Sequence, residues 1–366
     1  MDPGTFTIDY IQALKDLGFN RISLGVQSFH DNTLQLLGRT HRYIDILTSI
    51  QYISQVGIEN YSIDLITGLP TMDIPLWIET LNIATTQLHP PPTHFSIYDL
   101  QVEKGTTFGQ WYPYRQQGQE QDEDEEEKEN YKNRTSLRIH VDKPTLPSLE
   151  DCAFMYRYTS GYLRSKGYDH YEISSYARSS PSSKEYQTRK NSTCTSSSSS
   201  SNSTWRSQHN QMYWETGAEW YALGLGATSF INGLRYTRPL PMKDYIDWVH
   251  KQFNAAAVQQ TDEWIPPWMG KHEKEEVSSL EDSLLLDVIL TRLRTKEGLD
   301  LHWVSQLRNG SQKVSAILRG AALGLDLGLI TKRNNCIRLV DPNGFLFSNE
   351  LISSIFYEVE TILERE

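Results

Sequence analysis

A regular alternation of strand-like and helix-like segments in the first hundred residues constrains the fold most. Three segments are short, apolar and β-branched, as buried parallel strands are: residues 21–27, 61–68 and 94–102. Three other segments carry apolar residues at helical spacing: residues 7–18, 33–57 and 75–88. Strands separated by helices of this length pair in parallel through right-handed crossovers. The pattern predicts an α/β fold, either part of a barrel or a doubly wound sheet.

Polar residues stand at three places where this fold would bring them near a ligand. Gln27 closes the first predicted strand, Asp64 lies inside the second, and Arg39 is expected opposite the end of the first strand. Ligands of such folds bind beyond the carboxyl ends of the strands. One buried polar residue is best explained by a bond to a nearby loop, because unpaired it would cost stability. Three of them favour a shared ligand, whose identity the spacing leaves open.

The charge and composition exclude several classes of function. The net charge is -11, and residues 120–129 contribute eight acids and one lysine, which is -7, so that the rest of the chain carries only -4. No dense Lys/Arg field exists, and we predict no nucleic-acid partner. No run of 18 or more apolar residues occurs, so no integral membrane segment is predicted. Cys152, Cys194 and Cys336 are far apart, which predicts neither a disulfide framework nor a self-contained metal site.

Polar segments divide the chain into parts. The acidic run and a serine-rich run cannot bury enough apolar surface to offset the entropy of ordering, and we expect both to be disordered insertions. The predicted boundaries are 1–112 for the α/β region, 113–149 for the acidic insertion and its connector, 150–261 for a barrel-associated region with a serine-rich insertion at 178–204, 262–276 for a linker, and 277–366 for a C-terminal domain.

Three further segments have recognisable patterns. Residues 151–167 have helical spacing, and residues 168–177 are expected to form one strand. The C-terminal domain opens with two helical segments, followed by apolar runs that flank turn residues. This order is typical of a winged-helix-like α+β domain, and the acidic balance of the chain favours a packing role for it over DNA binding.

The densest aromatic region follows the serine-rich run. It contains His209, Asn210, Tyr213 and Trp214 within six residues. Aromatic side chains suit a flat, apolar ligand, and a neutral imidazole can ligate haem iron. From spacing alone, however, a packed and hydrogen-bonded histidine is the better explanation.

Seven separated motifs then occur together in one order: "DPGTF", "GFNRISLGVQSF", "LGRTH", "IDLITGLP", "YEISSYA", "HNQMYW" and "WYALGLGATS". This set resembles the HemN/HemW branch of the radical S-adenosylmethionine (SAM) proteins over nearly the whole chain, the polar insertions excepted. The resemblance implies that residues 1–112 form part of a radical SAM (β/α) barrel and that 277–366 is the C-terminal domain of that branch.

Two kinds of protein in this branch have different functions. Oxygen-independent coproporphyrinogen III oxidases decarboxylate a porphyrinogen in porphyrin biosynthesis, whereas HemW-type haem chaperones bind haem and deliver it. "YEISSYA" and "HNQMYW" are more similar to the chaperones. The resemblance implies that His209, Asn210, Tyr213 and Trp214 contact haem, with His209 as a candidate iron ligand. It implies haem or a porphyrin, and haem-accepting proteins, as partners.

The resemblance also implies that Gln27, Arg39, Asp64 and Ile66 line a SAM site. Arg39 would hold the methionine carboxylate, Gln27 would meet the polar end of that group, and Asp64 would accept hydrogen bonds from the ribose hydroxyls. Ile66 would lie near the adenine. These roles come from the family and not from the spacing of the residues.

One family feature is missing from the sequence. The CxxxCxxC motif that binds a [4Fe-4S] cluster in the family precedes all the motifs found here, and this chain contains no such motif. Three thiolates are needed to hold a cluster with one iron free for SAM. We therefore expect a chain truncated at its N-terminus, with a barrel that lacks its first strands and with no catalytic residues of its own, or else a degenerate, non-catalytic relative. We expect a mitochondrial or plastid location if the source is eukaryotic, and a cytoplasmic one otherwise.

Overall fold

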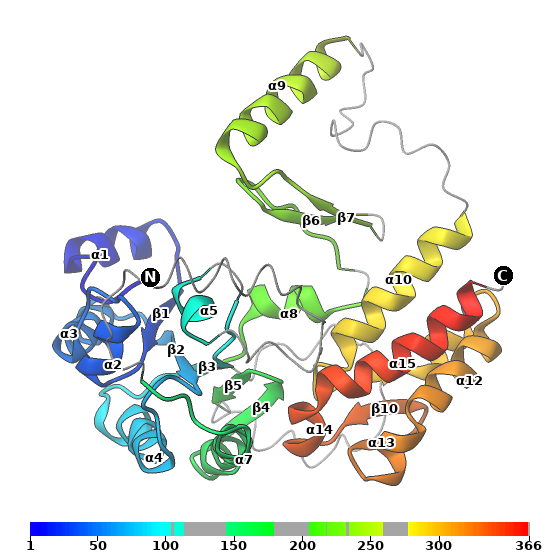
Figure 1. Ribbon diagram of the computed structural model, residues 1–366. Coiled ribbons are helices and arrows are strands. Elements are labelled where there is room, and N and C mark those ends of the chain that lie inside the picture. The colour runs from blue at the N-terminus through cyan, green and yellow to red at the C-terminus, as the bar shows by residue number, and fades with distance from the viewer. Residues whose placement is uncertain are drawn as a thin grey trace, which may run out of the picture. The chain divides into compact units, whose positions relative to one another are not determined.

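The computed structural model describes residues 1–103, 106–112, 144–178, 205–216, 218–231, 234–258 and 277–364 (Figure 1). These residues form two compact units, Met1–Thr159 and Ser160–Glu366. Most of both predicted insertions (113–143 and 179–204) and the predicted linker 262–276 lie outside the described residues, and the domain boundaries drawn from the sequence stay predictions. Within the described ranges, none of the helices has the length and apolar character needed to span a membrane.

The first unit has the predicted alternation of helices and parallel strands. Strand β1 pairs in parallel with β2, and β2 pairs in parallel with β3, which confirms the α/β class (Figure 1). In chain order its elements are α1 (Ile8–Asp16), β1 (Arg21–Gln27), α2 (Asp31–Leu36), α3 (Tyr43–Val56), β2 (Asn60–Thr67), α4 (Ile74–Asn82), the π-helix η1 (Ile83–Gln87), β3 (His94–Asp99) and α5 (Thr107–Trp111). Helix α7 (Leu149–Ser165) spans the boundary to the second unit.

The three strands have one apolar face and one polar face. On the apolar face Leu24, Ile63 and Phe95 are 0% exposed. The helices contribute equally buried residues, among them Ile46 of α3 and Trp77 of α4. Burial of these side chains removes apolar surface from water and supplies the core of the unit. The polar face is left to line a site.

The prediction of one continuous helix over 33–57 is wrong. The structure has two helices, because α2 ends at Leu36 and Gly38 adopts the left-handed conformation with φ +68°. The N–H of Arg39 donates to the carbonyl of Leu34 (2.9 Å), which closes the end of α2, and α3 begins only at Tyr43. Glycine has no Cβ to oppose a positive φ, so it ends helices in this way. The break puts Arg39 in a loop beside the end of β1.

The second unit begins with a hairpin where the sequence suggested one strand. Residues 168–177 form β4 (Tyr168–Glu172) and β5 (Ser175–Arg178), which pair antiparallel around a turn at Ile173 and Ser174. The turn was missed because it contains no glycine or proline, and the two serines at 174 and 175 were the only turn-forming residues at that point of the run. Next come α8 (Gln208–Trp214), the hairpin β6 (Thr228–Ile231) and β7 (Leu234–Thr237), and α9 (Met242–Val258).

The C-terminal part of this unit contains helices around a small antiparallel sheet of order β8-β10-β9. Its elements are α10 (Val277–Arg292), β8 (Leu299–Asp300), α11 (Leu301–Ser305), α12 (Gly310–Gly320), α13 (Ala322–Asp326), β9 (Ile330–Arg333), β10 (Cys336–Leu339), α14 (Asn343–Leu346) and α15 (Ser348–Leu363). Helices precede a hairpin in the order that the sequence suggested. Its winged-helix class stays a prediction.

Candidate functional site

The polar face of the first unit carries polar side chains at every second position of the strands. They are Arg21, Ser23 and Gln27 of β1, Asn60, Ser62 and Asp64 of β2, and His94 and Ser96 of β3. Side chains of a strand alternate between its two faces, so these residues share one face of the sheet. The sequence analysis singled out only Gln27 and Asp64. The signal for the others was present, because "RISLGVQ" and "NYSIDLIT" alternate polar and apolar residues.

Asp64 is the main anionic group of this face. Its carboxylate accepts hydrogen bonds from the hydroxyl of Ser23, at 3.0 and 3.2 Å. Burial raises the pKa of Asp64 above its usual value, although hydrogen bonds from Ser23 and Ser96 and the charge of Arg21 act in the opposite direction. The carboxylate is therefore costly to ionise, and hydroxyl donors from a ligand would stabilise it.

Gln27 is held in an unusual backbone conformation at the end of β1. Its φ is +63°, and the N–H of Ser28 donates to the carbonyl of Val26 across it (2.8 Å), as in a γ-turn with positive φ. The pairing of β1 with β2 shifts in register between Leu24 and Gln27. A residue other than glycine at positive φ is strained, and such strain is concentrated at binding sites.

Gln27 and Asp2 converge above Gly25, and Arg39 pairs with Asp2. A Cβ atom added to Gly25 would lie 2.9 Å from Oδ1 of Asp2 and 2.9 Å from Nε2 of Gln27. Arg39 donates from Nη1 to the same Oδ1 of Asp2 at 3.3 Å. Asp2 stands there because Met1 lies along β1: its amino group donates to the carbonyl of Ser23 (2.7 Å), and its carbonyl accepts from Gly25 (3.0 Å). Gly25 thus leaves a small cradle approached by the Asp2 carboxylate and the Gln27 amide, and Arg39 is paired with that carboxylate.

The four residues assigned to SAM all lie in the first unit. Gln27 ends β1, Arg39 pairs with Asp2, and Asp64 and Ile66 lie at alternate positions of β2, both partly exposed. An amide, a cation and a carboxylate are thereby gathered in one unit. Their assignment to SAM stays a prediction.

His94 lies at the other end of the polar face and is wholly buried. Its Nδ1 is 2.9 Å from the hydroxyl of Ser62. Burial lowers the pKa of His94 to about 3, and the charge of Arg21 adds to the effect. The imidazole is therefore neutral at physiological pH and takes part in a structural hydrogen bond.

This burial predicts a pH-dependent stability. The folded-state pKa of His94 is depressed, so its contribution is present above the unfolded pKa of about 6.5 and is lost as the pH falls. We expect the unfolding free energy to fall by up to about 1.4 kcal/mol per pH unit below that value from this residue. Urea unfolding at pH 7 and pH 5 measures the effect. In a His94→Asn variant, whose amide keeps a partner for Ser62, the loss should shrink; an unchanged pH slope would contradict the assignment.

The "HNQMYW" motif forms α8 in the second unit. Ser207 caps this helix, its hydroxyl accepting from the N–H of Asn210 at 3.3 Å. His209 is exposed, and its Nε2 is 3.3 Å from the hydroxyl of Tyr213, one turn later. Their rings meet edge to face, with centroids 5.1 Å apart. Met212, 44% exposed, lies on the same side of the helix.

Aromatic contacts continue from Tyr213 into the hairpin. The ring of Tyr213 meets Trp220 edge to face at 4.8 Å, and Trp220 stacks on Phe230 at 4.9 Å. Such contacts fix ring orientations. His209 is consequently presented at the surface, with the half-buried Tyr213 and the aromatic rings beyond it as support.

Trp214, the last residue of the motif, is bound differently. Its carbonyl accepts a hydrogen bond from Nη1 of Arg292 at 3.1 Å. Its indole Nε1 is buried without a hydrogen-bond partner among the described residues. An orphaned buried donor carries a cost that a ligand acceptor would relieve. The motif therefore divides into an exposed residue, His209, its half-buried neighbour Tyr213, and an anchoring residue, Trp214.

The described cysteines do not form a cluster site. Cys152 is half-buried in the first unit, and its Sγ would be 3.3 Å from a Cβ at Gly68. Cys336 is buried in the second unit and donates to the carbonyl of Glu297 at 3.1 Å. Cys194 lies outside the described residues. No group of three metal-binding side chains occurs in the part of the chain that the structure describes, and the residues present do not fit a [4Fe-4S] cluster.

Known proteins similar to this chain fall in one group. A family model described as "Radical SAM superfamily" matches residues 2–82. The "Heme chaperone HemW" of Synechocystis sp. is 33% identical over 98% of this chain and 74% of its own length. The "Heme chaperone HemW" of Bacillus subtilis is 28% identical over 78% of this chain and 58% of its own. The bovine "Radical S-adenosyl methionine domain-containing protein 1, mitochondrial" is 27% identical over 78% of this chain and 50% of its own.

The fold has a counterpart among solved structures. Coproporphyrinogen III oxidase (HemN) of Escherichia coli, described as a radical SAM enzyme, superposes with a TM-score of 0.62 at 17% identity, over 97% of this chain and 68% of that one. This likeness concerns the fold alone. The chain thus spans about three quarters of the cyanobacterial relative and little more than half of the Bacillus relative.

Proposed function

The chain belongs to the HemW family of the radical SAM superfamily, and on that premise we propose that it binds haem at α8 and passes it to an acceptor protein. The observation that carries this proposal is the exposed His209, with the half-buried Tyr213 beside it on one face of the helix. Neutral imidazole is a common axial ligand of haem iron. Binding of iron at Nε2 would replace a single 3.3 Å contact to Tyr213, which is a small cost.

The open position of this site suits transfer better than catalysis. His209 is exposed, and Met212 beside it adds apolar surface for the porphyrin. A haem held at a surface stays accessible to a second protein, whereas a catalytic pocket would enclose it. The chaperones among the relatives are named for haem, which supports the same ligand here.

A coproporphyrinogen oxidase is the less favoured alternative. The relatives that match most of this chain are named haem chaperones, and the likeness to the oxidase concerns the fold alone. We therefore rank the oxidase second.

We also propose that SAM binds at the cradle over Gly25. Arg39 would pair with the methionine carboxylate after releasing Asp2, and Gln27 would bond to the same end. Asp64 would accept from the ribose hydroxyls, and Ile66 would pack against the adenine. These contacts bind and orient the ligand without any group supplied by a cluster.

Replacing Asp64 with asparagine should lower the affinity for SAM without lowering the stability of the fold. Because burial raises the pKa of Asp64 in the folded state, ionisation costs stability as the pH rises through that pKa, and the variant should be no less stable than the wild type at pH 7. Its affinity for SAM should fall by about 10- to 100-fold, since hydrogen bonds to a charged acceptor contribute about 1.5–3 kcal/mol. Ligand-observed NMR and urea unfolding measure the two quantities. The exposed Asp9→Asn is the control; equal SAM binding by Asp64→Asn would remove Asp64 from the site.

Haem transfer tests the proposed function. Protein loaded with one equivalent of haemin is mixed with excess apomyoglobin, and the growth of the myoglobin Soret band is followed. We expect complete transfer, because haem is held at an exposed site. The same protein should leave coproporphyrinogen III unchanged. Failure to load haem, or haem that never leaves, would contradict a chaperone.

A further inference from the structure

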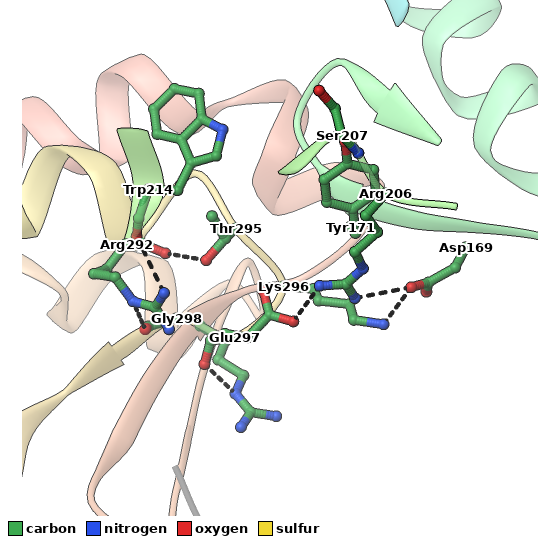
Figure 2. Close-up of polar contacts among 11 residues, drawn as sticks. Asp169, Tyr171, Arg206, Ser207, Trp214, Arg292, Thr295, Lys296, Glu297 and Gly298 are labelled. Atoms are coloured by element: carbon green, nitrogen blue, oxygen red, sulfur yellow. Dashed lines mark hydrogen bonds and ion pairs between the residues drawn. The ribbon is translucent and has the colours of Figure 1, made fainter. Parts of the chain in front are cut away.

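The α8 helix is held at both of its ends by one short segment, residues 292–298. This segment consists of the last residue of α10 and the connection from α10 to β8. Figure 2 shows the contacts of this segment with Trp214, the last residue of α8, and with Arg206, which precedes the cap of that helix. The segment contains no member of the "HNQMYW" motif. Its contacts nevertheless reach the residue before the cap of α8 and the last residue of that helix.

At the N-terminal end the contact is made through Arg206. This arginine precedes the cap Ser207, and it donates from Nη1 to Oε1 of Glu297 (2.9 Å) and from Nη2 to Oδ2 of Asp169 (3.0 Å). Its side chain is only 12% exposed. The guanidinium also lies over the ring of Tyr171, with Cζ 4.8 Å from the centroid, and the Tyr171 hydroxyl accepts from the N–H of Ser207 at 3.3 Å. Arg206 thus joins the start of α8 to β4 and to residues 292–298 (Figure 2).

The charges at this end are mutually stabilised. Burial alone would raise the pKa values of Asp169 and Glu297, but Lys296 and Arg206 hold both below their usual values. Lys296 donates to the same Oδ2 of Asp169 that Arg206 contacts. A planar guanidinium can hold two carboxylates at once, which the single ammonium of a lysine cannot do with the same geometry.

At the C-terminal end the contact is made through Arg292. Its Nη1 donates to the carbonyl of Trp214 (3.1 Å) and its Nε to the carbonyl of Gly298 (3.2 Å). The last carbonyls of a helix have no partner inside the helix, and a cation is favourable at that end. Arg292 satisfies one of these carbonyls and ties it to the same segment that holds Arg206.

The segment is itself fixed by the strands around it. The N–H of Lys296 donates to the carbonyl of Tyr171 (3.1 Å), and Glu172 forms an antiparallel bridge with Thr295. On its other side the carbonyl of Glu297 accepts from Nε of Arg338 at 2.9 Å. A segment bonded on two sides can serve as a rigid support.

We propose that residues 292–298 position the haem helix: Arg292 and Glu297, acting with Arg206, fix both ends of α8 so that His209 and Tyr213 face outward. This inference rests on the proposed function. A helix of seven residues is not stable by itself in water, and loss of either end contact would let the imidazole change its direction. Arg206 and Arg292 are positioning residues, because neither is His209 or Tyr213, the two residues proposed to meet the ligand.

The test compares Arg206→Met and Arg292→Met with a matched control. Arg319→Ala breaks an exposed pair with Glu358 between α12 and α15, away from the contacts of α8. Hydrogen exchange of the α8 amides in haem-free full-length chain, and haemin affinity with its Soret spectrum, are measured for each. We expect exchange of α8 to rise and haemin affinity to fall about tenfold or more in both arginine variants, as with other supports of a ligating histidine. Arg319→Ala should change neither.

A milder variant, together with the two measurements, distinguishes loss of positioning from misfolding. Arg206→Lys retains one carboxylate contact and should lie between wild type and Arg206→Met, which covers the case of a misfolded methionine variant. Unchanged α8 exchange in the arginine variants would overturn the proposal. Faster α8 exchange with unchanged haemin affinity would also overturn the proposal, provided that the His209→Ala variant has lost haemin affinity. If His209→Ala binds haemin as the wild type does, the proposed function fails instead, and α8 exchange alone decides whether the segment holds the helix.

Discussion

Replacing His209 with alanine should lower haem affinity by at least about 10- to 100-fold, the loss that follows when only an outer partner of a metal ligand is removed. The imidazole is exposed and makes one 3.3 Å contact with Tyr213, so its removal takes away an iron ligand at almost no cost to the fold. Haemin titration followed at the Soret band measures the affinity, and thermal unfolding should be nearly unchanged.

A second exposed histidine provides the control. His302 of α11 is exposed like His209 but has no aromatic support described around it. His302→Ala should bind haemin as the wild type does. Equal losses in both variants would indicate non-specific haem adsorption, and no loss in either would remove His209 from the haem site.

Replacing Lys313 with methionine is expected to produce the largest loss of stability. Its side chain is 1% exposed, and Nζ contacts Oδ1 of Asp282 (2.6 Å) and Oε1 of Glu281 (3.2 Å). Removing one partner of a fully buried pair costs about 3–5 kcal/mol. Because the side chains of Glu281 and Asp282 are 31% and 23% exposed, water can solvate part of the charge left behind, and we expect a loss of about 3 kcal/mol. Because α12 and α10 are joined by this contact, urea unfolding should show the loss directly.

The design of the Lys313 experiment separates charge from packing. Methionine keeps most of the apolar stem, so the loss reports the charge. Adding Glu281→Gln and Asp282→Asn to Lys313→Met should recover much of the stability, since the acids then need no cation. The exposed pair broken in Arg319→Ala should cost less than about 1 kcal/mol. Equal losses from Lys313→Met and Arg319→Ala would mean that the buried ion pair has no special role.

Local patterns predicted much of the first unit. Strand β1 was expected at the residues where it occurs, because a β-branched, apolar run is decisive over seven residues. The break before Arg39 was not foreseen, although Gly38 was the available signal: a glycine inside a helical pattern is often tolerated, and only the fold decides whether it takes a positive φ. Yet that break is what brings Arg39 to Asp2.

Long-range contacts were beyond the reach of the sequence. Lys313 occupies an ordinary place in a helical pattern, where a lysine is normally exposed. Asp169, Arg206 and Glu297 come from three distant segments, and nothing in the local sequence of any one indicates the other two. The motif around His209 was recognised through its family, and the different exposure of His209, Tyr213 and Trp214 depends on contacts with distant segments.

Chemical rescue tests the central claim most directly. A His209→Gly variant leaves a gap that free imidazole can enter, and the Soret spectrum of its haemin complex is recorded with and without added imidazole. If the α8 imidazole ligates haem, the variant alone should lose the wild-type spectrum, and imidazole should restore it. A variant that binds haemin with the wild-type spectrum without imidazole would contradict the account.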